Sequence, residues 1–487
     1  MAKVILPIAN GYYESDSLPI SAQECTNLYP NIAQAPALNQ ETLFGTPGLT
    51  QVASASDLDN CRGAHEMNGV PYFVIGAHLF SMAEDYTLTQ RSNVTISGNG
   101  RVSMADNGTQ LLLLVPGGNG FIYNHVTNSF AQITDADFTA NGNPQQVVFI
   151  DGFFCLTTDT KKFIVSALND GLSYNALDFG TAESDPDEIV APIVFKNQLF
   201  IGGSQTIEAF QNIGGADFPF QRTGLFLSKG ISSPFSIQSI QDTFVFVGAG
   251  ANESPAIWAL SGNSVTKIST TAIDKELSAL TETQIQDIFS FAYAEKGAYF
   301  VGFTLPGTAL VYDTISKRWH ERKSFVDGAL GAYRVNALVR AYNQLWAGDL
   351  VDGRIGLLDQ DIYTEYGTEI RRTIVTQPFQ NKMEPFVLPE LELTVESGVG
   401  NSAAEDPMVG MERSTDAKIW SDARYRKIGK IGEYNRRVIW NRNGRASRFE
   451  LFRFTMSEPV KPVFIQMTAD IVLSLIHISE PTRRSYI

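Results

Sequence analysis

One pattern recurs along most of this chain: a short apolar, β-rich run, a turn containing Gly, Asn or Asp, and a second apolar run. Seven such pairs start roughly 35–55 residues apart, a spacing that brackets the repeat of about 40–50 residues of a β-propeller blade. They lie at residues 69–82, 108–124, 147–166, 197–210, 242–260, 296–313 and 343–359. The pattern predicts an all-β fold with a β-propeller of about six to seven blades.

The periodicity of these runs excludes a helical solenoid. The runs alternate with period two or are wholly apolar over about 4–8 residues, and they lack the stripe of period 3.6 that marks helices. The one convincing helix lies at 269–294, where a Ser/Thr cap precedes Asp and Glu in the first turn. We expect this helix to be an insertion before the sixth repeat.

The pattern changes on both sides of the repeats. Residues 1–60 are turn-rich, and we expect them to form an extended N-terminal arm that either closes the ring of blades or reaches a neighbour. The propeller then occupies residues 61–365. Residues 366–470 hold longer alternating strands joined by Gly, Asn and Pro turns, which predicts a separate antiparallel β-sandwich after the propeller.

The last stretch, residues 471–487, has an unrelated composition. Its segment SLIHISEPTRR resembles the translated read-through of a common sequencing adapter. We therefore expect residues 471–487 to be a non-native tail, and they take no part in the functional reasoning.

Composition limits the class of protein. The formal net charge of -15 makes the surface as a whole a poor binder of nucleic acid, because that affinity comes from phosphate neutralisation by Lys and Arg. Cys25, Cys61 and Cys155 are too far apart for a metal knuckle or a disulfide framework. The N-terminus lacks the apolar stretch of a signal peptide, and no run approaches a membrane span. Synthesis in the cytoplasm fits these features best.

Catalytic motifs are absent from the sequence. It contains no phosphate-binding loop, zinc helix, nucleophile elbow or complete calcium loop, and we expect neither a cofactor nor an enzyme. His65, His78, His125 and His320 are scattered over different repeats, so a shared metal site is not expected. In LVYDTISKRWHER (310–322), we expect a hairpin in which Trp319 points to one face and His320 to a polar, solvated face.

Acidic groups leave a second class of function open. Carboxylates at 57–59, 135–137, 184–188 and 359–361 could supply the paired acids of a glycoside hydrolase. Asp is also a favoured turn residue, because its side chain accepts hydrogen bonds from nearby backbone N–H groups, and we favour turns here. A glycoside hydrolase and a glycan-binding, receptor-binding propeller are the alternatives to a structural role.

A basic segment follows near the end of the chain. Between Asp422 and Arg453, ten basic residues face three acids. A basic patch on an acidic body suits docking against an acidic protein surface, including that of a second copy. A solvated sandwich face and nucleic-acid binding are the other uses of such a patch. The candidate interface residues are Arg424, Arg426, Lys427, Arg436, Arg437, Arg442 and Arg445.

Several segments together resemble one protein family. GNGRVSMA (98–105), NQLFIGGSQTIEAF (197–210), LSKGISSP (227–234), LVYDTISKRWHER (310–322) and RYRKIGKIGEYNRRVIWNRNGR (424–445) are similar, in this order, to the packaged-DNA stabilisation protein of short-tailed bacteriophages, the tail hub or nozzle family. The resemblance runs from about residue 60 to 470.

The resemblance implies a structural virion protein without catalysis. Members of this family form a sixfold tube below the portal and adaptor proteins, carry tailspikes or fibres and the tail needle, and retain packaged DNA. It therefore implies a homohexamer in the virion tail, made in the host cytoplasm, that lets double-stranded DNA pass without sequence-specific binding and contacts no membrane. Because such a ring is closed, each subunit must use two different faces for its neighbours.

Overall fold

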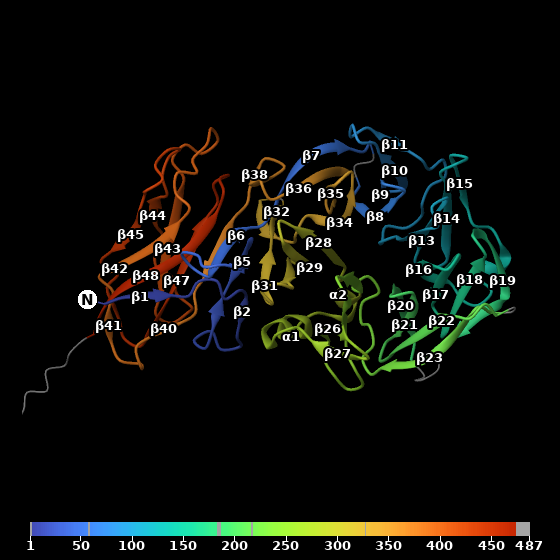
Figure 1. Cartoon of the computed structure of the whole chain (residues 1–487), viewed down its shortest axis with the longest axis horizontal. Helices are drawn as coiled ribbons and strands as arrows, with labels where there is room; N and C mark the ends of the chain where they lie inside the picture. The colour runs from blue at the N-terminus through green and yellow to red at the C-terminus, as the bar shows by residue number, and fades with distance from the viewer. Residues whose placement is uncertain (1, 57–58, 183–186, 216–217, 327, 474–487) are drawn as a thin grey trace, which may run out of the picture. The chain divides into compact units, whose positions relative to one another are not determined.

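The chain divides into two compact units in the computed structural model, which describes residues 2–56, 59–182, 187–215, 218–326 and 328–473. One unit spans residues 46–370. The other combines the residues up to Gly45 with those from Arg371 onward, so its blue N-terminal strands lie among its red C-terminal strands in Figure 1. We expected boundaries near residues 60 and 365; the structure has them at 45/46 and 370/371.

The unit of residues 46–370 is a β-propeller. Its described residues form seven antiparallel four-stranded sheets arranged as successive blades (Figure 1). The first three blades contain β8 (Cys61–Met67), β9 (Val70–Ile75), β10 (His78–Met82) and β11 (Leu88–Gln90); β12 (Ser103–Asp106), β13 (Gln110–Val115), β14 (Asn119–Asn124) and β15 (Ser129–Gln132); and β16 (Pro144–Ile150), β17 (Phe153–Thr158), β18 (Lys162–Ala167) and β19 (Asp170–Thr181).

The next three blades repeat this arrangement, and the seventh takes its fourth strand from the N-terminal region. These blades contain β20 (Ile189–Phe195), β21 (Gln198–Gly203), β22 (Ile207–Asn212) and β23 (Phe220–Leu227); β24 (Gln238–Ile240), β25 (Thr243–Gly248), β26 (Ala256–Ser261) and β27 (Ser264–Lys267); β28 (Ser290–Glu295), β29 (Ala298–Leu305), β30 (Thr308–Asp313) and β31 (Arg318–Arg322); and β34 (Val335–Ala341), β35 (Gln344–Asp349), β36 (Arg354–Asp359) and β7 (Gly48–Ser54).

Local turn chemistry explains why the predicted hairpins form. The seven sequence repeats are the second and third strands of the seven blades, which confirms the propeller prediction. In five of the seven blades, the tight turn before the second strand holds two successive residues with positive φ, as at Asn68 (55°) and Gly69 (81°) in the first blade. Such turns match the twist of the paired strands. Asn and Gly reach this conformation at low cost, so these turns are readable in the sequence.

Apolar clusters hold the blades together. Each of five clusters joins two adjacent blades, such as the one that brings Phe73 of the first blade against Trp346 of the seventh. Both faces of a blade are therefore buried, as expected for a propeller. The ring is closed by β7, which pairs antiparallel with β36.

The remaining elements of this unit are short. They are η1 (Ala136–Phe138), α1 (Thr271–Ser278), α2 (Glu282–Gln286), β32 (Ser324–Val326), β33 (Ala329–Gly331), β37 (Thr364–Glu365) and β38 (Thr368–Glu369). The helix expected at 269–294 is thus wrong in extent. α1 ends at Ser278, Thr281 caps α2 in a capping box with Gln284, and the chain then becomes the inner strand β28. The apolar end of the expected helix is buried as a strand because that position completes a blade.

The second unit is a β-sandwich, as expected for the C-terminal region. The long strand β48 pairs with β1, β42, β41 and β6 in one layer, and β47 pairs with β39, β40 and β43 in the other. The layers enclose an apolar core around Trp440, Phe452 and Phe464. The unit's strands are β1 (Ala2–Leu6), β2 (Tyr13–Glu14), β3 (Ala22–Gln23), β4 (Cys25–Thr26), β5 (Leu28–Ile32), β6 (Glu41–Gly45), β39 (Arg372–Val375), β40 (Phe379–Gln380), β41 (Phe386–Val387), β42 (Glu390–Val395), β43 (Met408–Ser414), β44 (Arg424–Lys427), β45 (Val438–Asn441), β46 (Arg445–Ala446), β47 (Phe449–Met456) and β48 (Val463–Leu473).

The ends of the chain differ in part from expectation. Residues 1–60 were expected to be one extended arm that closes the ring or reaches a neighbour; β7 does close the ring, but β1 to β6 belong to the sandwich. The expected non-native tail began at residue 471, yet β48 continues to Leu473 and pairs there with Phe386. The rest of that tail, 474–487, lies outside the described residues. No helix in the described part of the chain is both long and apolar enough to cross a membrane.

Candidate functional site

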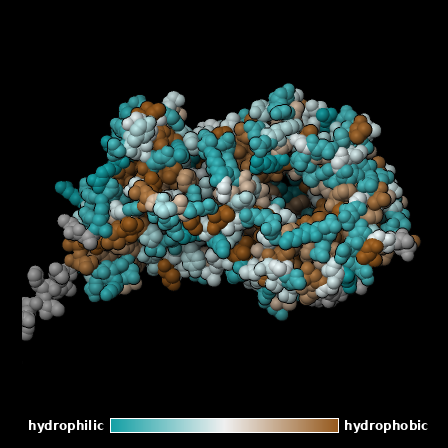
Figure 2. Space-filling model, in the orientation of Figure 1, coloured by the Kyte–Doolittle hydropathy of each residue, from teal (hydrophilic) through white to brown (hydrophobic). Residues whose placement is uncertain are grey.

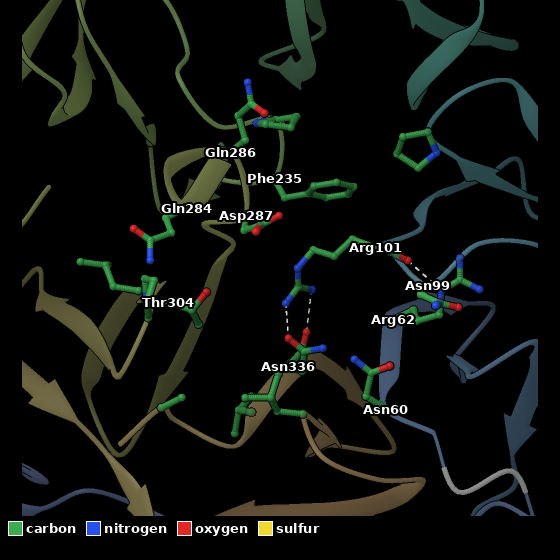
Figure 3. Close-up of a pocket in the computed structure, with 18 of the residues that line it drawn as sticks. Asn60, Arg62, Asn99, Arg101, Phe235, Gln284, Gln286, Asp287, Thr304 and Asn336 are labelled. Carbon is green, nitrogen blue, oxygen red and sulfur yellow. Dashed lines mark hydrogen bonds between the residues drawn. The ribbon is translucent and has the colours of Figure 1, made fainter. Parts of the chain in front are cut away.

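The central channel of the propeller holds two cavities. A cavity of about 620 Å³ is lined by residues from the first strand of all seven blades. A second cavity, of about 730 Å³, lies at one mouth of the channel and is lined mainly by loops and by α2. Its polar side chains include Asn60, Asn99, Gln284, Gln286 and Asp287 (Figure 3). A hollow is visible on the propeller in Figure 2.

Arg101 lies where the two cavities meet. Its Nη1 donates a hydrogen bond of 2.7 Å to the backbone oxygen of Asn336 in the seventh blade, and its Nη2 donates to the Asn336 side chain (Figure 3). The guanidinium carbon lies 3.6 Å from the centre of the Phe289 ring, just before the sixth blade. Arg101 precedes the second blade, so its side chain bridges the channel. Burial lowers the pKa of Arg101 to about 9, and the group stays charged at neutral pH.

Arg62 is a structural neighbour of this bridge. Its guanidinium is buried and donates four hydrogen bonds of 2.7–3.2 Å to backbone oxygens, those of Gly76, Ile96, Ser97 and Gly100. These bonds hold the loop that leads to Arg101. Arg101 lies in the segment GNGRVSMA (98–105), which carries part of the family resemblance, but neither Arg62 nor Arg101 was predicted as a site residue. An isolated Arg in an apolar stretch of an acidic chain was the available signal.

The scattered histidines are part of the blades. His65 Nε2 lies 2.7 Å from Asp106 Oδ2, which joins the first strands of the first two blades. Burial opposes ionisation of Asp106, but hydrogen bonds from His65 and the Gly108 amide hold its pKa below the usual value. No group of three His, Cys, Asp or Glu side chains suited to a metal ion occurs among the described residues.

The expectation that His320 faces solvent is wrong. Its side chain is fully buried, its Nε2 accepts a 3.4 Å hydrogen bond from Arg322 Nε, and its ring meets the Phe300 ring edge-on at 5.7 Å. Burial and the Arg322 charge hold its pKa well below the usual value, so the imidazole is neutral. A polar face on a propeller strand does not indicate solvent, because the adjacent blade covers it.

Several carboxylates of the acidic groups that suggested a glycosidase accept hydrogen bonds from backbone N–H groups, some within their own turn and some from distant loops. Asp135 accepts hydrogen bonds from the backbone N–H groups of Asp137 and Tyr174. Asp359 accepts one from the Asp361 N–H, and Asp187 accepts from Gln205 and Thr206. Residues 57–58 and 184–186 of the other groups lie outside the described residues.

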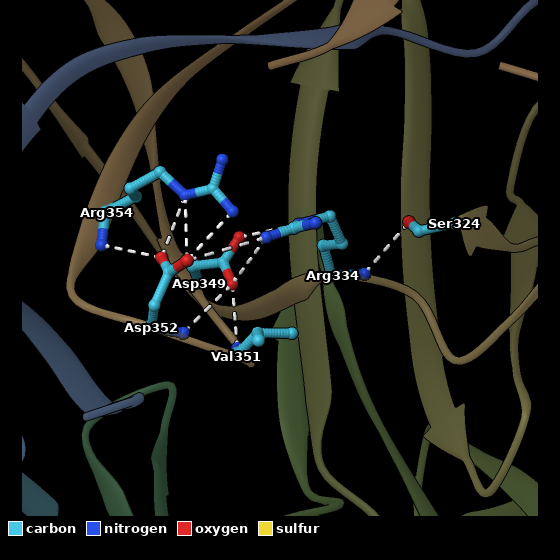
Figure 4. Close-up of polar contacts among 6 residues, drawn as sticks. All are labelled: Ser324, Arg334, Asp349, Val351, Asp352 and Arg354. Carbon is cyan, nitrogen blue, oxygen red and sulfur yellow. Dashed lines mark hydrogen bonds and ion pairs between the residues drawn. The ribbon is translucent and has the colours of Figure 1, made fainter. Parts of the chain in front are cut away.

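A buried ionic cluster stabilises the closing blade (Figure 4). Arg334 donates to both carboxylate oxygens of Asp349, at 2.8 and 3.1 Å. Asp349 also accepts from the Val351 N–H, and Arg354 donates to Asp352 at 2.9 and 3.0 Å. Because each buried charge meets an opposite charge or a hydrogen-bond partner, the cluster is structural.

The predicted interface residues on the sandwich fall into two groups. In the first group, the charge is used within the chain. Arg437 donates to both oxygens of Glu392 at 2.7 and 2.8 Å, and Lys427 pairs with Asp406. Arg424 and Arg426 donate to backbone oxygens, including those of Asn441 and Ile439.

The second group is exposed and forms no ion pair among the described residues, although the charge of Arg436 acts on Asp406 nearby. It contains Arg436, Arg442, Arg445 and the adjacent Arg448. The exposed apolar side chains Tyr425, Ile431 and Tyr434 lie on the same stretch. Exposed Arg and Tyr are the residue types enriched in protein interfaces.

Charge is divided unequally between the units. Residues 46–370 contain 34 Asp and Glu but only 18 Lys and Arg, whereas the remaining residues contain 18 and 19. The net negative charge of the chain therefore belongs to the propeller.

Comparison with known proteins was made with this geometry in view. The family model of the β-propeller of bacteriophage P22 Gp10 matches residues 4–363, and that of the β-sandwich of the same protein matches residues 371–472. The chain is 24% identical over 376 residues to the tail hub protein gp10 of Salmonella phage P22, which covers 74% of this chain and 77% of that protein.

Two solved structures are among those with some likeness to this chain. Selenomethionine-substituted virginiamycin B lyase from Staphylococcus aureus has a TM-score of 0.45 and 11% identity, covering 64% of this chain and 99% of that chain. The WD40 β-propeller domain of Doa1 has a TM-score of 0.38 and 12% identity, covering 64% and 97%. Neither similarity is strong enough to support an argument about function.

Proposed function

This chain belongs to the bacteriophage P22 Gp10 family, and from that premise we propose that six copies form a closed ring in the tail of a short-tailed phage. A structural role as a phage tail hub follows from family membership. We propose further that the ring attaches below the portal and adaptor proteins, carries tailspikes or fibres and the tail needle, and retains packaged DNA. Assembly would follow synthesis in the host cytoplasm.

The match of both domains to the family carries this proposal. It covers residues 4–363 and 371–472, so the propeller and the sandwich occur in the family's order. Seven blades joined by apolar clusters supply a rigid wall, which suits a tube under internal pressure.

DNA would pass through the centre of the ring of subunits and not through a propeller. The channel cavities measure about 620 and 730 Å³, and Arg101 bridges the channel between them. The major groove of duplex DNA alone is about 12 Å wide. The 34 acids of the propeller would repel phosphates, so DNA could slide past the wall without being held.

The exposed arginines of the sandwich are the proposed docking surface. Arg436, Arg442 and Arg445 would meet an acidic surface on a neighbouring subunit or on the adaptor. Arg437 was expected to join them, but its pairing with Glu392 makes it part of the sandwich itself.

The test uses particles from an infection in which this gene is disrupted. We expect heads that package DNA and then lose it, and that bear no spikes. Adding the purified protein should restore nuclease-protected DNA, infectivity and a ring visible by electron microscopy below the head. Particles that keep their DNA and infect without the protein would contradict the proposal.

A further inference from the structure

The connection between β44 and β45 forms a protruding tip on the sandwich. The sandwich tip, residues 430–436, exposes Ile431 to 75% and Tyr434 to 70%. Hydrogen bonds fix its shape: the Glu433 N–H donates to the Lys430 oxygen at 2.9 Å, and Ser397 Oγ donates to the Tyr434 oxygen at 2.5 Å. An ordered tip with two exposed apolar side chains and a charged Arg436 is built for contact with another protein.

A groove on the propeller complements the sandwich tip, because it is hollow and carries acidic side chains in place of basic ones. The propeller groove is a cavity of about 600 Å³ contributed by the third, fourth and fifth blades and by α2. Its apolar lining includes Ile189, Val190, Ile231 and Ile285, and no Lys or Arg lines it. Glu188 and Glu282 stand exposed at its rim and form no ion pair among the described residues.

We propose that the sandwich tip of one copy docks into the propeller groove of the next copy in the ring. Ile431 and Tyr434 would cover the apolar lining, and Arg436 would meet the rim carboxylates of Glu188 and Glu282. The inference rests on the proposed ring and names the contact that closes it. Because the two surfaces differ, the contact is heterologous, as a cyclic ring requires.

A second copy is the partner best supported by charge. The groove belongs to the unit that holds the chain's whole net negative charge, and the tip belongs to a stretch with uncompensated arginines. Opposite surfaces on one chain recognise each other between copies, whereas like surfaces repel. Each copy would then offer one tip and one groove.

Two charge-reversed variants test the contact. The tip variant carries Arg436→Glu, and the groove variant carries Glu188→Lys and Glu282→Lys. Lys418→Glu, at the opposite end of the β43–β44 hairpin from the tip, and Glu84→Lys, in the first blade, are the matched controls. All four changed surfaces are exposed, so each variant should remain a folded monomer by circular dichroism and sedimentation.

Each variant is added to particles that lack the protein. We expect at least a tenfold loss of restored infectivity and of rings with either variant alone, and wild-type levels with the controls. Mixing the two variants should restore both. In the mixture, the reversed tip fits the reversed groove and the unchanged tip fits the unchanged groove, so the two variants can alternate around a ring with an even number of subunits.

The outcomes separate this contact from the ring itself. If the wild type forms rings and both variants do so equally well, the contact is wrong and the ring stands. If the tip variant alone fails and the mixture gives no rescue, the tip binds the adaptor and the proposed contact is again wrong. If the wild type restores particles without any ring, the proposed function is overturned as well.

Discussion

The channel of the propeller and the basic segment of the sandwich use arginine in opposite ways. In the propeller, Arg62 and Arg101 lie in or beside the channel and bind backbone oxygens, an amide and an aromatic ring. Arg322 is fully buried, with its guanidinium carbon 5.0 Å from the centre of the Phe300 ring. In the sandwich, Arg436 and Arg442 extend into solvent. Arginine thus builds the wall of the propeller channel, whereas the sandwich, which also buries Arg372, leaves Arg436 and Arg442 available to a partner.

This contrast shows why net charge alone is a poor guide to a surface. Among the described residues of the propeller, six Asp and Glu side chains are buried and only three Arg, so its outside is less acidic than the count of 34 acids and 18 bases suggests, although acids still predominate there. The sandwich is nearly neutral in total, yet its carboxylates already pair with part of its basic segment. What remains exposed on each unit is opposite in sign.

The largest expected effects come from the two buried tryptophans. Trp346 and Trp440 are each fully buried, one in each unit. Changing either to Ala should cost about 3–5 kcal/mol, because a large cavity replaces the ring. Calorimetry of the whole chain should show two unfolding transitions, with Trp346→Ala lowering one and Trp440→Ala the other. If either variant lowers the midpoint temperatures of both transitions equally, the two units unfold as one, and the contrast between propeller and sandwich does not extend to their stability.

Breaking the ionic cluster of the closing blade should rank next. Asp349→Asn leaves the Arg334 guanidinium buried without its carboxylate and should cost about 3 kcal/mol. The sandwich supplies a surface counterpart in Lys461, which pairs with Glu396 at 2.9 Å. Lys461→Ala should cost less than about 1 kcal/mol. Urea unfolding of both variants measures the difference, and equal losses would show that burial does not decide the strength of these pairs.

A buried carboxylate makes the sandwich sensitive to pH. Burial raises the pKa of Glu450 to about 7, although the Arg413 guanidinium beside it acts in the other direction. The stabilisation by protonated Glu450 is fully present below the unfolded-state pKa of about 4.3 and is lost as pH rises through about 7, a change on the order of 3–4 kcal/mol. Melting of the sandwich transition at pH 5 and pH 8 measures it. Glu450→Gln should flatten this dependence and leave the propeller transition unchanged.

The smallest expected effect concerns a surface pair. Hydrogen bonds from Arg437 and Lys3 lower the pKa of Glu392 to about 2. The stability that this carboxylate contributes is present above its unfolded-state pKa and is lost as pH falls through about 2. Arg437→Ala should move the Glu392 pKa toward its ordinary value, as measured by NMR titration, with a small loss of stability. An unchanged pKa would mean that the pair does not persist in solution, and Arg437 would return to the docking surface.

Local signals in the sequence predicted much of the fold. The central hairpin of each blade is predicted by two apolar runs on either side of a turn such as Asn68–Gly69, whose conformation suits those residue types. The sandwich was predictable from the alternation in its longer strands. Signals of this kind are complete within some 20 residues, so no distant partner is needed to recognise them.

The pairings between distant segments were not predictable. Closure of the ring by residues 1–60 was one expectation, but nothing in them indicates that β1 pairs with β48 or gives the register of β7 on β36, because register with a remote strand has no local signature. The same limit applies to the site. The basic segment could be recognised in the sequence, but the hydrogen bonds that Arg437 donates to Glu392 form only in the folded chain. The burial of His320 likewise depends on the fold.

The pairing of the first strands with the last ones has a consequence for synthesis. Ser54 can pair only after Arg354 has been synthesised, and Ala2 only after Ile471. Neither domain is therefore complete until nearly its whole sequence has left the ribosome. At about 5–20 residues per second, the first of these delays lasts roughly 15–60 s. A chain released early has two unfinished sheets with open edges, which chaperones and proteases recognise. The topology therefore distinguishes full-length translation products from truncated ones.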